Sequence, residues 1–222
     1  MSGWDRILAE LIEHGRMIVA SVLAGAVRTA PLVVPWPTAA SPATLLEFHQ
    51  AEDWLEFLRE WDIHGAVPRI VASKYQRAQR LYALSWLDYD LIKAGELVAL
   101  TALELALRDR YGAHYRRPNK PQATLHTLLR HMVEVDKLTD AVVPFVKRYG
   151  GSIISNLYET DAARTARKAT QSPAQTTLAG IRNRLAHGDP FDGLPWSGLL
   201  ELIRDLIEFA YRDMIADTSR LA

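Results

Sequence analysis

Residues 91–112, LIKAGELVALTALELALRDRYG, decide the fold class of this chain because their apolar side chains recur at helical spacing. The apolar positions that repeat at intervals of three and four are Leu97, Leu100, Leu103, Leu107 and Tyr111. Asp90 stands where a helix cap belongs, and Gly112 stands where the helix is expected to end. Glu104 and Arg108 are four residues apart, in the order that favours an ion pair on a helix surface. This stretch predicts a long helix.

Helical periodicity extends through most of the chain from residue 73 onward. Further helices are expected over residues 75–89, 124–135, 153–168 and 195–217, with one more ending at Tyr149. No segment alternates polar and apolar residues convincingly over the length of a strand. We therefore predict an all-α protein, an antiparallel up-and-down helical bundle.

The N-terminal part, residues 1–70, carries no chemical motif. A first helix is followed by Thr29–Thr44, a segment with four prolines that we interpret as an irregular connection. Ser41 and Pro42 suit the cap and first position of a second helix. We expect an N-terminal helical extension, packed on a bundle formed by residues 71–222.

Composition excludes several classes of protein. The chain has no cysteine, which rules out disulfides, thiolate metal sites and a cysteine nucleophile, and which fits a reducing cytoplasm. Its N-terminus is acidic and amphipathic, unlike a signal peptide. The longest apolar run, residues 17–27, has 11 residues and is too short to span a bilayer. We predict a cytoplasmic protein without a membrane segment.

Charge is balanced overall but unevenly distributed along the chain. Residues 108–184 contain 14 Lys and Arg against 6 Asp and Glu. This asymmetry predicts a basic surface for an anionic partner. The alternative is that the acidic and basic parts attract each other, or attract a second subunit.

The densest group of functional residue types lies in residues 178–192, LAGIRNRLAHGDPFD. Asn183 and His187 are four apart and fall nearly above one another on a helix, and the adjacent Arg182 can reach the same groove. Gly188–Pro190 is expected to stop this helix. The stretch predicts a cation and a proton-transfer group at one exposed helix end. The alternative is a capped helix end with a surface ion cluster.

Other candidate sites carry less chemical information. The basic loop 114–120, HYRRPNK, is either a solvated connection or a phosphate contact. His126, His131 and Glu134 suggest metal ligands, but the remaining carboxylates of a di-iron bundle are missing, so no metal site is predicted. Gly150–Gly151 is a hinge and lacks the pattern of a phosphate-binding loop.

The pair Arg182-Asn183, followed after three residues by His187, resembles the motif of the HEPN superfamily, the higher-eukaryote and prokaryote nucleotide-binding domains. The resemblance covers residues 73–217 and includes Glu104 on the earlier helix. It implies a four- or five-helix up-and-down bundle, usually dimeric, that needs no cofactor. Many members are metal-independent ribonucleases of toxin and antiphage defence systems, whereas others only bind RNA, nucleotides or a partner.

The resemblance implies a catalytic role for three residues, Arg182, Asn183 and His187. In RNA cleavage the ribose 2′-hydroxyl attacks the adjacent phosphate, so the reaction needs a base and an acid. His187 can serve as either near neutral pH, and Arg182 can stabilise charge on the phosphate oxygens. Asn183 would orient His187 or hydrogen-bond the RNA. Glu104 would hold Arg182 by analogy with an acidic residue of the family.

RNA and a second subunit are the partners that this interpretation predicts. Since each chain has one such histidine, a homodimer that apposes two motifs would supply both acid and base. The predicted RNA contacts are Arg116, Arg117, Lys120 and Arg184. An antitoxin or sensor protein is a further possible partner. Family members silenced by a nucleotidyltransferase antitoxin often have tyrosine two residues after the histidine, and Asp189 stands there instead. A non-catalytic binding module and a helical interaction scaffold are the competing functions.

Overall fold

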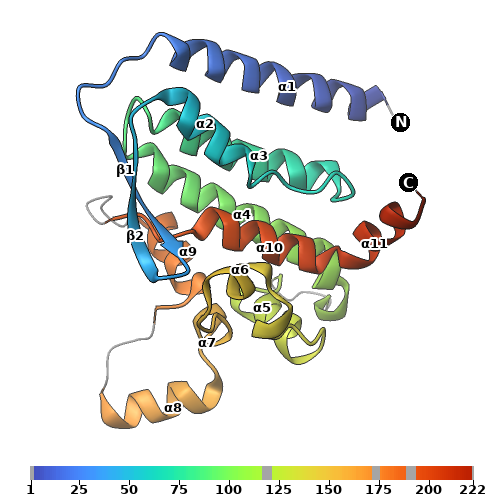
Figure 1. Cartoon of the computed structure of the whole chain (residues 1–222). Coiled ribbons are helices and arrows are strands. Elements are labelled where there is room, and N and C mark those ends of the chain that lie inside the picture. Colours follow the sequence, from blue (N-terminus) through green and yellow to red (C-terminus); the bar gives the residue numbers. More distant parts are fainter. Residues whose placement is uncertain (1–2, 117–121, 172–175, 189–193, 222) are drawn as a thin grey trace.

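The computed structural model describes residues 3–116, 122–171, 176–188 and 194–221 (Figure 1). The first half of the chain forms α1 (Gly3–Ala24), β1 (Leu32–Thr38), β2 (Ser41–Phe48), α2 (Ala51–Arg59), α3 (Arg69–Leu84), α4 (Leu91–Tyr111) and the 3-10 helix η1 (Gly112–Tyr115). The second half forms α5 (Leu125–Glu134), the 3-10 helix η2 (Asp140–Val142), α6 (Pro144–Tyr149), α7 (Ile154–Leu157), α8 (Asp161–Thr170), α9 (Leu178–Ala186), α10 (Leu199–Ala210) and α11 (Arg212–Leu221). The protein is therefore mostly helical. None of the helices in these described ranges is both long enough and apolar enough to cross a membrane.

Helix α4 lies at the centre of the helical body and packs against α3, α5, α9 and α10. The predicted apolar positions Leu100, Leu103 and Leu107 are fully buried on it. Its bounds agree with the sequence prediction, although the Asp90 side chain forms no capping hydrogen bond. Because other helices surround α4, it provides the frame on which the later helices are placed.

Residues 32–48 form a β-hairpin, so the protein is mostly helical rather than entirely helical, and the helix predicted from Ser41 begins only at Ala51. The strands are antiparallel, with register from Leu32 opposite Phe48 to Thr38 opposite Ser41. β1 is buried along most of its length on both faces, which hides the alternation that identifies a half-exposed strand. Both strands are edge strands, where the missing N–H of proline is tolerated.

An aromatic cluster joins the hairpin to α2 and to the residues that follow it. Trp36 of β1 stacks on Trp61 with ring centroids 5.7 Å apart, and it contacts the edge of Phe57 at 4.9 Å. The Tyr75 hydroxyl of α3 donates to the carbonyls of Trp61 and Leu200. The N-terminal segment thus belongs to the same apolar core as α4 and α10.

Two of the predicted C-terminal helices are divided in the structure. Residues 153–168 were expected to be one helix, but extended backbone at Tyr158 and Thr160 separates α7 from α8. Residues 195–217 were also expected to be continuous, but α10 ends at the buried Tyr211, whose hydroxyl donates to Asp109 at 2.8 Å. The break thus coincides with a tertiary contact to α4.

Candidate functional site

Helix α9 carries the arginine, asparagine and histidine of the motif and is anchored by its apolar face. Leu178, Ile181 and Leu185 are buried, at the spacing of one face of a helix that packs on α4 and α7. The Thr177 hydroxyl caps the helix by accepting the backbone N–H of Gly180 at 3.1 Å. Packing of the apolar face leaves the polar side chains of α9 at the surface of the body.

The C-terminal end of α9 places His187 at the surface, as the sequence predicts. The His187 backbone N–H donates to the carbonyls of Asn183 and Arg184 at 3.0 and 3.1 Å, and its side chain is exposed. Gly188 follows with a φ of 86°, the left-handed conformation that glycine adopts most easily. Asp189 and Pro190, which were expected to help stop the helix, lie outside the described residues.

Arg182 is paired with the carboxylate of Glu104 across the interface between α9 and α4. Its Nη2 lies 2.9 Å from Glu104 Oε2, while Arg108 Nη2 donates to Glu104 Oε1 at 2.5 Å. The Glu104 side chain is only 7% exposed, whereas those of Arg182 and Arg108 are 30% and 41% exposed. One buried carboxylate is thus shared by two guanidinium groups that both reach solvent.

This shared carboxylate leaves the site with net positive charge. Two guanidinium groups carry up to ten N–H donors, and Glu104 occupies few of them. Arg182 Nε is buried without a hydrogen-bond partner among the described residues. Guanidinium groups with free donors in a fixed orientation are suited to phosphate or carboxylate anions. The arrangement can therefore bind an anion at the surface between α9 and α4.

Asn183 and His187 are held less firmly than Arg182. Asn183 is exposed, and its Oδ1 accepts a long hydrogen bond of 3.4 Å from Arg182 Nη1. Within the part of the chain that the structure describes, no hydrogen bond is made by the His187 imidazole. The structure therefore has the cation and its carboxylate in place, and among the described side chains no acid or base is hydrogen-bonded to His187.

A buried pair on α4 anchors the chain where it returns after the motif, a feature that the sequence analysis missed. Lys93 Nζ donates to the Leu194 carbonyl at 2.7 Å and lies 3.5 Å from Glu96, whose other oxygen accepts the Trp196 N–H at 2.5 Å. Burial raises the pKa of Glu96 to about 7, against the opposing effect of Lys93. Arg184 lies over the Trp196 ring at 6.0 Å. In the sequence, Lys93 and Glu96 have the spacing of an exposed ion pair on a helix, and nothing indicates that they are buried.

The predicted RNA-contact residues are described only in part. Arg116 and Arg184 are both exposed, as a contact with a polyanion requires. Arg117 and Lys120 lie outside the described residues. No structural observation brings Arg116 together with the group around Arg182.

His126, His131 and Glu134, which the sequence suggests as metal ligands, contact other side chains in the structure. His131 is buried and packs against Tyr111 with the ring centroids 4.6 Å apart, and its Nδ1 lies 3.0 Å from the Tyr115 hydroxyl. Burial lowers the pKa of His131. Glu134 accepts a hydrogen bond from Tyr158. Across the described ranges, no three His, Asp or Glu side chains are grouped so as to hold a metal ion.

Comparison with known proteins does not assign the chain to a family. No protein-family model, curated protein or solved structure shows a significant match to this chain. Its function must therefore be argued from the site itself.

Proposed function

We propose that the chain is a metal-independent endoribonuclease of the HEPN type, built on an up-and-down helical bundle and acting as a toxin or antiphage defence effector. The observation that supports this most directly is the ion pair between Arg182 and the buried Glu104, five residues before the exposed His187. The buried Glu104 holds the guanidinium group of Arg182 in a fixed orientation, which favours binding of a phosphate over a mobile surface ion cluster.

In this proposal Arg182 and Arg108 bind the non-bridging oxygens of the scissile phosphate. Their charge stabilises the pentacoordinate transition state, in which negative charge increases on those oxygens. His187 removes the proton from the 2′-hydroxyl or donates one to the 5′-oxygen that leaves. The products are a 2′,3′-cyclic phosphate and a 5′-hydroxyl. Asn183 orients the imidazole or hydrogen-bonds the RNA.

We propose a two-fold homodimer as the active form. The reaction transfers two protons, and the motif supplies one histidine per chain. Two motifs that face each other would place one His187 as the base and the other as the acid in a shared basic groove. Like charges across the two-fold axis oppose its closure, so RNA that bridges the arginines should strengthen the dimer.

A second candidate function is a non-catalytic module that binds RNA, a nucleotide or a protein partner. The observation that favours it is the absence of any group, among the described residues, that orients the His187 imidazole. Catalytic histidines are usually held by a third residue. The arginine pair around Glu104 would bind a phosphate equally well without cleavage.

The decisive experiment is cleavage of end-labelled RNA by the purified protein in EDTA. We expect 2′,3′-cyclic phosphate ends, and we expect Arg182→Ala and His187→Ala to abolish cleavage. His49→Ala is the matched control, because His49 is an exposed histidine on a distant loop after β2. Retention of RNA without cleavage, lost in Arg182→Ala, would favour the binding module. Full activity in the His187 variant would refute a ribonuclease site here.

The composite site has a separate test. Wild-type chains are mixed with increasing amounts of His187→Ala chains under conditions of subunit exchange. If each site needs two histidines, activity should fall as the square of the wild-type fraction. A linear fall, or full activity from a demonstrated monomer, would contradict the dimer.

A further inference from the structure

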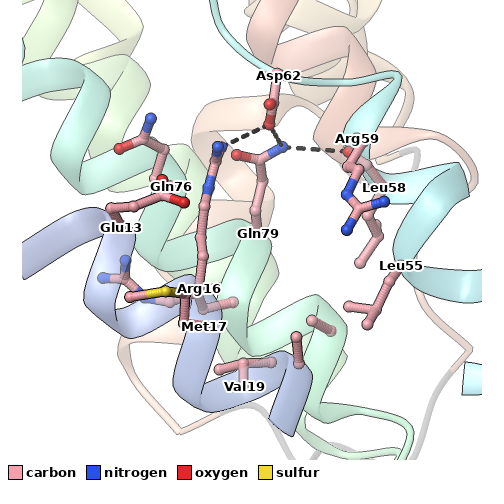
Figure 2. Close-up of a pocket in the computed structure, with 13 residues that line it drawn as sticks. Glu13, Arg16, Met17, Val19, Leu55, Leu58, Arg59, Asp62, Gln76 and Gln79 are labelled. Carbon is pink, nitrogen blue, oxygen red and sulfur yellow. Dashed lines mark hydrogen bonds and ion pairs between the residues drawn. The ribbon is translucent and has the colours of Figure 1, made fainter. Parts of the chain in front are cut away.

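A cavity of about 240 Å³ lies between α1, α2 and α3, far along the chain from the motif on α9 (Figure 2). Its lining is apolar on one side and polar on the other. The apolar part is formed by Met17, Val19, Ala20, Leu55, Leu58 and Ala83. Pockets of this kind, apolar with a few placed polar groups, are typical of small-molecule sites.

Two of the three arginines around the cavity are already neutralised. Arg16 Nη2 donates to Asp62 Oδ1 at 2.7 Å, and Arg59 Nη1 donates to Glu56 at 2.6 Å. Gln79 Nε2 donates to the same oxygen of Asp62 at 2.9 Å (Figure 2). These contacts fix one wall of the cavity and leave it without net charge.

Arg80 is the arginine of this group that forms no ion pair with a described side chain. Its Nη1 is buried and has no hydrogen-bond partner in the described part of the chain. It reaches across to α1 at Gly15, where an added Cβ would lie 3.2 Å from Nη1. Burial lowers the pKa of Arg80, and the charges of Arg77 and Arg16 lower it further. The guanidinium therefore sits in positive potential that an anion would relieve.

The remaining polar groups on the cavity wall need hydrogen-bond donors. Gln76 Oε1 and Gln79 Oε1 are buried without partners in the described residues, and Gln79 is only 8% exposed. Glu13 also lines the cavity; it is exposed, and it forms no ion pair with a described side chain. Buried polar groups in folded proteins are usually hydrogen-bonded, so the amide oxygens of Gln76 and Gln79 are available to accept hydrogen bonds from a bound molecule.

We propose that this cavity binds a free apolar α-amino acid of the size of leucine or methionine. The carboxylate pairs with Arg80, the ammonium group lies toward Glu13 and the two glutamine oxygens, and the side chain packs on Leu55, Leu58 and their apolar neighbours. One free cation and one free anion match a zwitterion, whereas a phosphate dianion would need more positive charge.

The size of the cavity agrees with this class of ligand. A cavity of about 150 Å³ holds benzene, so one of this volume suits a molecule of roughly ten non-hydrogen atoms. Leucine and methionine each have about that number. Aromatic residues are missing from the described lining, which disfavours a nucleobase.

Isothermal titration calorimetry on the full chain tests the proposal with three probes of one shape. L-Leucine has both charged groups, 4-methylpentanoate lacks the ammonium, and 3-methylbutylamine lacks the carboxylate. We expect leucine to bind, and each analogue to bind roughly tenfold to a hundredfold more weakly, the range for loss of one charge-assisted interaction. No binding of leucine or methionine at millimolar concentration would overturn the proposal.

Variants assign each charge to its partner. Arg80→Met should weaken the binding of leucine by a similar factor, while Arg220→Met, which replaces an exposed arginine of α11 that does not line the cavity, should leave it unchanged. Glu13→Gln should weaken the binding of leucine but leave the binding of 4-methylpentanoate unchanged. Should Arg80→Met fail to fold, judged by circular dichroism, Arg80→Lys keeps the charge and should retain part of the affinity. Equal leucine affinity in the Arg80 variants and the wild type would refute the site.

Discussion

Replacement of Glu104 by glutamine tests whether the carboxylate between α4 and α9 holds the site together. The substitution keeps the shape of the side chain and removes its charge. In the folded protein Glu104 forms an ion pair with Arg182 at 2.9 Å and accepts a hydrogen bond from Arg108 at 2.5 Å, and its side chain is almost fully buried. Glutamine can still accept one hydrogen bond, but it leaves two guanidinium groups close together without a counter-charge.

The expected loss of stability follows from burial. Hydrogen bonds to charged groups contribute about 1.5–3 kcal/mol each when buried. Water replaces part of this interaction, because the Arg182 and Arg108 side chains are 30% and 41% exposed. We therefore expect Glu104→Gln to lower the free energy of unfolding by about 2 kcal/mol, which for a chain of this size lowers Tm by about 4–8 °C.

Urea unfolding at 0.1 and 0.5 M salt is the assay, and Glu56→Gln is the matched control. Glu56 also pairs with an arginine at 2.6 Å, but both side chains are about 70% exposed. Glu56→Gln should lower the free energy of unfolding by no more than about 0.5 kcal/mol at low salt, and by no measurable amount at high salt. The effect of Glu104→Gln should persist at high salt. Equal, small effects of both substitutions would refute the idea that burial makes this pair important.

Three further predictions follow from single residues. Burial raises the pKa of Glu96 from 4.5 to about 7, so between pH 4.5 and 7 the folded protein binds more protons than the unfolded chain. The free energy of unfolding that Glu96 contributes should therefore fall as the pH rises through this range. Glu96→Gln should remove this pH dependence. An unchanged slope would show that other groups cause it. Gly95→Ala places a Cβ 2.6 Å from the Tyr82 ring and should lower the free energy of unfolding by about 1–3 kcal/mol. Thermal unfolding measures this loss, with Gly25→Ala as the control because no atom lies within 4 Å of a Cβ there. A Gly95 variant of unchanged stability would contradict this packing. Thr177→Ala removes the cap of α9, so it should lower the free energy of unfolding by about 1 kcal/mol and speed amide hydrogen exchange in that helix. Unaltered exchange would mean that packing alone stabilises α9.

Local sequence signals were sufficient for several elements of this protein. The bounds of α4 follow from the spacing of its leucines, and the cap of α5 follows from Thr124, whose side chain accepts the Thr127 N–H. The end of α9 follows from Gly188, which has the left-handed conformation expected of a glycine there. These features depend on residues within one or two helical turns, so a sequence can specify them without knowledge of the rest of the fold.

Other features depend on contacts between distant segments, and these the sequence reasoning missed or left open. β1 is buried on both faces, which removes the alternation that reveals a strand, and α10 ends where Tyr211 reaches Asp109 on α4. In the candidate site, the positions of Arg182 and His187 on one helix end followed from spacing. The ion pair with Glu104 was expected only by analogy with a family, because its two members are 78 positions apart and meet only when α9 packs on α4. Burial and long-range contact are properties of the packed chain, and only the tertiary structure decides them.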